Sequence, residues 1–171
     1  MKEYRVKVFE KRTEWYNLEG QLHREDGPAV EYADGDKCWH RYGQLHREDG
    51  PACERANGNK YWYRDGQRHR EDGPACEYSN GDKLWYRDGQ LHREDGPAVE
   101  LADGDKWWYR DGQRHREDGP AVELTDGIKS WYIEGRKLTG SEFNSRNKTE
   151  LTLDQIAERF GIPAESLKIK K

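Results

Sequence analysis

The sequence predicts an all-β protein: an elongated, single-layer array of antiparallel β-hairpins with a small C-terminal helix. The segment Gln44-Leu45-His46-Arg47-Glu48-Asp49-Gly50-Pro51-Ala52 recurs with a period of 23 residues, which is typical of stacked repeats. Each repeat contains Asp-Gly or Asn-Gly turns and lacks helical periodicity. Only 32% of the residues are hydrophobic and 37% are charged. Each unit therefore buries a thin layer and needs its neighbours to complete a core.

The chain divides into four predicted segments. Residues 1–14 contain an alternating strand at positions 4–9 that caps the first repeat. Residues 15–140 hold the hairpin repeats, and 141–150 are a polar linker. Residues 151–171 form a helical segment with a basic tail, in which Thr152 and Gln155 make a capping box and Gly161 ends the helix. This helix either caps the array or contacts a partner.

Two-residue turns predict the strand register. With Asp34-Gly35 as the loop, Val30 faces Trp39, and with Asp65-Gly66 as the loop, Trp62 faces His69. In the first copy, Tyr16 takes the place of the repeated Trp. The predicted structural ladder consists of Trp39, Trp62, Trp85, Trp108, Trp131, His46, His69, His92 and His115.

The Arg-Glu-Asp-Gly-Pro segment is predicted to be a bent connection. Identical units stacked by translation need an even number of antiparallel strands, which favours an excursion or bulge at Asp49-Gly50 over a third tight hairpin. Glycine permits the bend, and proline cannot donate to a strand ladder. We therefore expect two main strands per repeat.

Charge and cysteine content limit the possible partners and location. Residues 21–135 contain 17 basic and 25 acidic residues, which favours a partner protein with a basic surface over the phosphates of nucleic acid. The three cysteines, Cys38, Cys53 and Cys76, do not suggest a disulfide framework. The sequence contains neither a secretion signal nor an apolar run of the ~20 residues that a transmembrane segment needs. We therefore expect a cytoplasmic protein.

The chain resembles a MORN-type repeat protein, in the variant form found in bacteria and their phages. The resemblance rests on Trp-Tyr-Arg-Asp-Gly-Gln-Arg-His at 62–69 and Ala-Val-Glu-Leu-Ala-Asp-Gly-Asp at 98–105, and it covers about residues 15–140. It implies one elongated, twisted sheet of hairpins used for protein or lipid contact rather than catalysis. Bacterial members are often labelled antitoxin-like. The Arg-Glu-Asp-Gly-Pro-Ala block replaces the Gly-rich step that is usual in the family.

The repeated His and acidic residues have both chemical and structural interpretations. The histidines, with Cys53 and Cys76 on the same face, suggest a metal ladder. However, each unit offers one His, whereas zinc takes three or four protein ligands. The Glu-Asp pairs suggest acid/base catalysis, but five copies would make five identical sites without a nucleophile. We therefore expect no metal, no cofactor, no catalytic residue and no enzyme.

These observations predict a non-enzymatic protein-binding repeat module, such as an antitoxin-like or phage-encoded inhibitor that occupies a basic surface of its partner. One alternative is a structural component that self-assembles into a homo-oligomer. Another is an aromatic platform for single-stranded nucleic acid or nucleotides. The predicted partner-binding residues are Arg47, Glu48, Asp49, Arg70, Glu71, Asp72, Arg93, Glu94, Asp95, Tyr63, Tyr86 and Tyr109.

Overall fold

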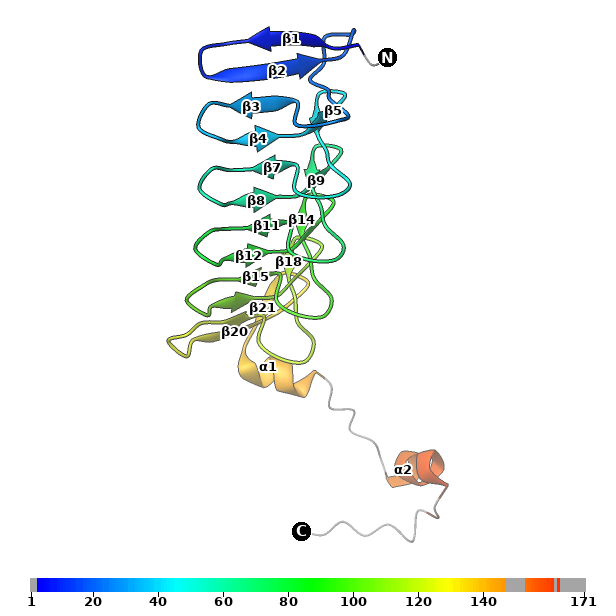
Figure 1. The fold of residues 1–171 in the computed structure, drawn as a ribbon. Helices are drawn as coiled ribbons and strands as arrows, with labels where there is room; N and C mark the ends of the chain where they lie inside the picture. Colours follow the sequence, from blue (N-terminus) through cyan, green and yellow to red (C-terminus); the bar gives the residue numbers. More distant parts are fainter. Residues whose placement is uncertain (1–2, 147–152, 162, 164–171) are drawn as a thin grey trace. The chain divides into compact units, whose positions relative to one another are not determined.

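The computed structural model describes residues 3–146, 153–161 and 163, and the chain divides into two compact units. The first unit is Met1–Leu138 and the second is Thr139–Lys171. The first unit consists of antiparallel hairpins that recur with the 23-residue period of the sequence (Figure 1). The predicted hairpin array is therefore confirmed. It ends at Leu138, the residue that replaces the repeated His.

A 13-stranded antiparallel sheet forms the main body of the first unit. Each full repeat contributes two strands to it, as the parity argument predicts. In order across the sheet, the strands are β1 (Arg5–Val8), β2 (Arg12–Tyr16), β3 (Val30–Tyr32), β4 (Lys37–Cys38), β7 (Cys53–Glu54), β8 (Lys60–Tyr61), β11 (Cys76–Glu77), β12 (Lys83–Leu84), β15 (Val99–Glu100), β16 (Lys106–Trp107), β19 (Val122–Glu123), β20 (Lys129–Ile133) and β21 (Arg136–Leu138).

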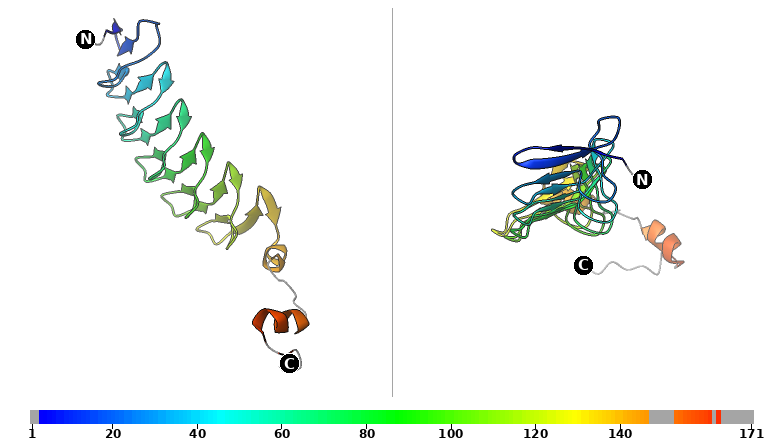
Figure 2. Two further views of the ribbon diagram at one scale, coloured as in Figure 1. Left: turned by 90° about the vertical axis from the view of Figure 1, so that its right-hand side faces the viewer. Right: turned by 45° about the horizontal axis from the view of Figure 1, so that its top comes forward.

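Short hairpins form a second row beside the main sheet (Figure 2). They are β5 (His40–Arg41) with β6 (Gln44–Leu45), β9 (Tyr63–Arg64) with β10 (Gln67–Arg68), β13 (Tyr86–Arg87) with β14 (Gln90–Leu91), and β17 (Tyr109–Arg110) with β18 (Gln113–Arg114). Tyr63 faces Arg68, as predicted. The turn residues Asp65 and Gly66 have φ angles of 48° and 79°, as a type I′ turn requires.

The turn at the other end of the main strands is one residue longer than predicted. Val30 faces Cys38 rather than Trp39. The Tyr32 amide donates to the Asp36 carbonyl at 2.9 Å, so the loop is a three-residue one that ends on Gly35 at φ 98°. An Asp-Gly sequence is compatible both with a two-residue type I′ turn and with a three-residue turn whose last residue is glycine, so the sequence does not distinguish them.

The first copy of the repeat is also shifted by one residue. The His23 amide donates to the Trp15 carbonyl at 3.0 Å, as the His46 amide donates to the Trp39 carbonyl at 3.1 Å. Trp15, and not Tyr16, is therefore equivalent to the later tryptophans. The reason is a longer connection: the stretch between Trp15 and His23 holds one residue more than the stretch between Trp39 and His46.

The core is a thin row of small side chains. The alanine after the proline of each Arg-Glu-Asp-Gly-Pro loop is fully buried, and the next residue, Val or Cys, is also buried. Val30, Cys38 and Cys53 form one cluster, with Leu22, Leu45 and Tyr61 packed against it. Since each repeat supplies so few apolar atoms, burial depends on the adjacent repeats.

The second unit contains two helices, α1 (Gly140–Ser145) and α2 (Leu153–Phe160). Residues 140–145 were predicted to lie in or next to a linker, but Thr139 and Glu142 form a capping box that starts α1. Helix α2 agrees with the predicted helical spacing. The capping residue predicted for α2, Thr152, and the basic tail lie outside the described residues.

Candidate functional site

Each Arg-Glu-Asp-Gly-Pro loop closes around the guanidinium group of its own arginine. The Cζ atom of Arg93 lies 4.0 Å from the ring centre of Trp85. Arg93 Nε donates to Asp95 Oδ1 at 2.9 Å, and Nη1 donates to the Pro97 carbonyl at 3.2 Å and to Glu100 Oε1 at 2.7 Å. These hydrogen bonds use three of the five N–H groups of the guanidinium. The same arrangement recurs at Arg24, Arg47, Arg70 and Arg116.

The glycine of each loop leaves room for that guanidinium. A Cβ atom on Gly96 would lie 3.0 Å from Arg93 Cζ, so the arginine would have to shift. The corresponding distances at Gly27, Gly50, Gly73 and Gly119 are 2.9 to 3.1 Å. The glycine was predicted to permit a bend, and the structure adds close approach of a side chain as a second reason for it.

The repeated histidines connect each repeat to the next. His69 is buried, and its Nδ1 accepts the backbone N–H of Asp88 at 3.2 Å. In a neutral ring with this bond, the proton sits on Nε2, which lies 3.4 Å from Glu71 Oε1. Asp88 Oδ1 is also 2.8 Å from Nδ1. The His-carboxylate contact was predicted, but the group stacked on the indoles of Trp39, Trp62, Trp85 and Trp108 is a loop arginine and not the imidazole.

A second arginine ladder links adjacent loops at the surface. Arg87 Nη1 donates to Glu94 at 3.2 Å, and its Nη2 donates to Asp111 of the following repeat at 3.3 Å. The Arg87 side chain is 45% exposed, so each such pair contributes about 0–1 kcal/mol. Arg41, Arg64 and Arg110 make the corresponding bonds to Glu48, Glu71 and Glu117.

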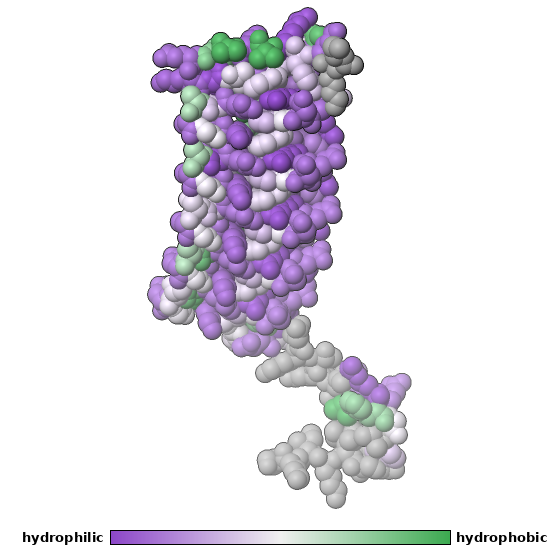
Figure 3. All heavy atoms as spheres, in the orientation of Figure 1, coloured by the Kyte–Doolittle hydropathy of each residue, from purple (hydrophilic) through white to green (hydrophobic). Residues whose placement is uncertain are grey.

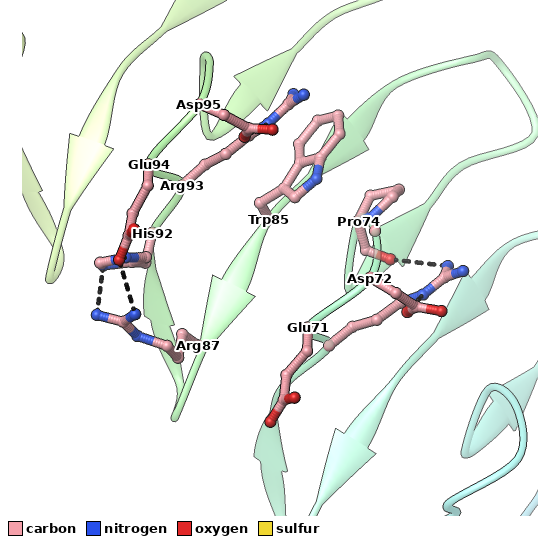
Figure 4. Close-up of a pocket in the computed structure, with 11 residues that line it drawn as sticks. Glu71, Asp72, Pro74, Trp85, Arg87, His92, Arg93, Glu94 and Asp95 are labelled. Atoms are coloured by element: carbon pink, nitrogen blue, oxygen red, sulfur yellow. Dashed lines mark hydrogen bonds and ion pairs between the residues drawn. The ribbon is translucent and has the colours of Figure 1, made fainter.

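A row of four pockets follows the successive loops of the first unit, with one loop between each pocket and the next, and we call this row the groove. Four segments of the groove, of about 740, 710, 900 and 530 Å³, follow one another from repeat to repeat. Neighbouring segments share the Arg-Glu-Asp triad that lies between them. Figure 4 shows one segment, in which Trp85 lies between the loop of Asp72 and Pro74 and the loop of Arg93 and Asp95.

Carboxylates are the most exposed charged groups of the groove. The side chains of Glu71 and Asp72 are 78% and 84% exposed, whereas that of Arg70 is 22% exposed. A hydrogen bond from Arg70 lowers the pKa of the Asp72 carboxyl, and a hydrogen bond from Arg64 lowers the pKa of Glu71. Both groups are therefore ionised at neutral pH. A ligand entering the groove meets negative charge first.

The structure brings together most of the predicted partner-binding residues. The triads at Arg47, Arg70 and Arg93 line the groove, and so does Tyr63. The hydroxyls of Tyr63 and Tyr86 both accept hydrogen bonds from Arg68, and that of Tyr109 accepts one from Arg114. These tyrosines therefore have structural partners of their own.

The structure also places residues in the groove that were predicted for other roles. Trp39, Trp62, Trp85 and Trp108 line it, although they were assigned to a structural ladder. The glutamates that hold the loop arginines, such as Glu100, were not predicted. Their signal was available: a Glu follows each loop arginine after seven residues in every full copy.

Within the part of the chain that the structure describes, no three His, Cys, Asp or Glu side chains are grouped so that they could hold a metal ion. None of the helices formed by the described residues has the length and apolar character needed to cross a membrane.

The sequence was compared with protein-family models and with curated proteins. No family model matches the chain, and no curated protein matches it.

Proposed function

We propose that the chain is a non-enzymatic, MORN-type protein-binding module that takes a basic segment of a partner protein into the groove. The exposure of the loop carboxylates supports this most directly, because the arginines of the same loops are turned inward against indoles. An antitoxin-like or phage-encoded inhibitor that covers a basic surface would use such a groove.

The geometry of the array suggests the spacing of the partner's charges. Two strands per repeat, at about 4.8 Å each, give a rise of roughly 9.6 Å between equivalent carboxylates. An extended or polyproline II chain advances about 3.1–3.3 Å per residue. A segment with Lys or Arg at every third position would therefore place one cation beside each loop.

Synthetic peptides test this proposal directly. Repeated Arg-Pro-Pro places arginines at every third position, and a peptide of the same composition with its arginines in one block is the comparison. We expect fluorescence anisotropy to show the spaced peptide binding several-fold more tightly. Failure of both peptides to bind would contradict the proposed function, and equal binding would contradict the spacing alone.

Matched charge variants locate the binding surface. Glu48→Gln, Glu71→Gln and Glu94→Gln together remove three groove carboxylates, and we expect about tenfold weaker peptide binding. The control removes three carboxylates at the outer turns, Asp34→Asn, Asp103→Asn and Asp126→Asn. Each of those aspartates accepts an amide two residues later, a role that asparagine retains. Equal weakening by both sets would mean that net charge, and not the groove, holds the peptide.

The first hairpin favours a second candidate function, self-association. β1 is an edge strand of the main sheet, and Val6, Val8 and Phe9 are 51%, 77% and 45% exposed. Apolar residues gather on this hairpin, while the array face in view is largely hydrophilic (Figure 3). Unpaired edges of this kind can pair with another chain. Light scattering of the peptide-binding samples over a concentration series would detect a dimer, and a constant monomer mass would exclude it.

A further inference from the structure

Two cysteines face one another across the boundary between the first two full repeats. Cys38 ends β4 and Cys53 begins β7, and their Sγ atoms are 2.7 Å apart. Both residues are buried, at 6% and 3% exposure. The two thiols are thus held in contact within the thin core, away from the groove.

The backbone register suits a covalent link at this position. Cys38 and Cys53 are directly opposite in the β4–β7 ladder. The next pair along, Trp39 and Ala52, carries the hydrogen bond from the Trp39 amide to the Ala52 carbonyl at 2.8 Å. Hydrogen-bonded and non-hydrogen-bonded pairs alternate, so the cysteines occupy a non-hydrogen-bonded pair, where Cα atoms lie about 4.5 Å apart. A disulfide accepts Cα separations of roughly 4.4–6.8 Å.

This pair of facing residues differs from the equivalent pairs of the other described repeats. The corresponding positions are occupied by Tyr61 with Cys76, Leu84 with Val99, and Trp107 with Val122. At Cys38, a small thiol replaces the large side chain of those pairs. Cys76, in contrast, lies between Tyr61 and Leu84.

We infer that Cys38 and Cys53 are an oxidative modification site that closes into a disulfide when the protein meets a low-molecular-weight disulfide. When local opening of the β4–β7 pair exposes it, the Cys38 thiolate attacks oxidised glutathione, forms a mixed disulfide and releases one glutathione thiolate. Cys53 then loses its proton and attacks the Cys38 sulfur, which expels the second glutathione thiolate. One glutathione disulfide is reduced to two thiols while the two cysteine thiols are oxidised.

The surroundings of the pair favour Cys38 as the attacking sulfur. A hydrogen bond from Cys53 lowers the pKa of the Cys38 thiol, and the positive charge of Arg55 acts in the same direction against burial. The same contact raises the pKa of the Cys53 thiol. The resulting disulfide would join β4 of one repeat to β7 of the next and would oppose the separation of these two strands.

The test uses the full-length protein incubated with oxidised glutathione under native conditions, followed by alkylation in denaturant and mass spectrometry. We expect the loss of two hydrogen atoms, one alkylated thiol at Cys76, and a linked peptide containing Cys38 and Cys53. The oxidised protein should melt about 5–10 °C higher than the reduced protein. Three alkylated thiols, or a link that includes Cys76, would overturn the inference.

Variants provide a second, independent readout. Cys76→Ser should still form the internal link, whereas Cys38→Ser and Cys53→Ser should not, and their melting temperatures should not respond to oxidised glutathione. All three substitutions alter buried cysteines, so Cys76→Ser controls for the effect of a buried serine on folding. The peptide map of the unaltered protein does not depend on any variant being folded.

Discussion

Arg93 and Arg87 are six positions apart, yet they do different work. Arg93 is inserted beneath its loop, stacked on Trp85 and bonded to a backbone carbonyl and two carboxylates. Arg87 lies on the surface, where it bridges Glu94 and Asp111. The first arrangement needs a planar fork with donors in fixed directions, and the second needs a positive charge more than a shape.

We predict that Arg93→Lys lowers the free energy of unfolding by about 1–3 kcal/mol, because lysine cannot replace the stacked fork and leaves the Pro97 carbonyl without its donor. The matched control, Arg87→Lys, should cost about 0–1 kcal/mol, since exposed ion pairs contribute little. Urea denaturation followed by tryptophan fluorescence measures both. An equal decrease in the free energy of unfolding in the two variants would show that the stacked Arg93 does not stabilise the loop more than the surface Arg87 does.

The structure of the Arg-Glu-Asp-Gly-Pro loop could be predicted only in part from its amino-acid sequence. A bent connection was predicted and is present, because parity disfavours a third hairpin and Gly-Pro breaks a ladder. The direction of the bend was not predictable, since it depends on the stacking of Arg93 on Trp85, eight residues earlier. The outer turn at Asp34-Gly35 was predicted one residue too short for a similar reason: its letters are also those of the turn at Asp65-Gly66.

The loops should make the stability of the array sensitive to acid. Hydrogen bonds from the loop arginines lower the pKa values of Asp49, Asp72, Asp95 and Asp118 in the folded state. In the unfolded chain an aspartate titrates near pH ~3.9. Between the lowered folded-state pKa and the unfolded-state pKa, the unfolded chain binds more protons than the folded protein. The stabilisation is therefore fully present above about pH 5 and is lost as the pH falls through the folded-state pKa values.

Circular dichroism melts over a pH series check this expectation. These aspartates should leave the melting temperature nearly unchanged near neutral pH and should lower it below about pH 5. A protein with Asp72→Asn and Asp95→Asn should start from a lower melting temperature and lose less on acidification. An acid-induced fall of the same size in this variant would contradict the role given to the arginine bonds.

At the scale of the whole first unit, stability and binding should both depend on the number of repeats. Stacked repeats contact only their neighbours. His69 and Arg64 both bond to Asp88 of the next repeat, and loops of adjacent repeats line the same pocket. Nearest-neighbour arrays of this kind tolerate the loss of a complete unit. The loss of half a unit should not be tolerated, because it would reverse the direction of every later strand.

Deleting residues 70–92 joins His69 to Arg93 and preserves the repeated motif at the junction. We predict a folded protein that melts several degrees lower and binds long spaced peptides more weakly. Deleting residues 70–81 instead should give a protein without the cooperative melt. Equal behaviour of the two deletions in circular dichroism would contradict the two-strand repeat as the unit of folding.

The position of the groove could be predicted only in part. The carboxylates and loop arginines were named from their recurrence, and they do line it. Trp85 was assigned to the core because indoles usually supply buried area, but one repeat is too thin to cover it on all sides. The contact between Cys38 and Cys53 was not predicted, because it depends on the pairing of β4 with β7, two strands that no two-residue turn connects.

The histidine bonds give the array a polarity. Each imidazole accepts a hydrogen bond from a backbone N–H of the following repeat. This bond therefore always runs in the same direction along the array. At the last position, Leu138 has an aliphatic side chain with no atom able to accept that bond. A repeat inserted within the array would therefore keep this bond on both sides, whereas a repeat added after Leu138 would lack it.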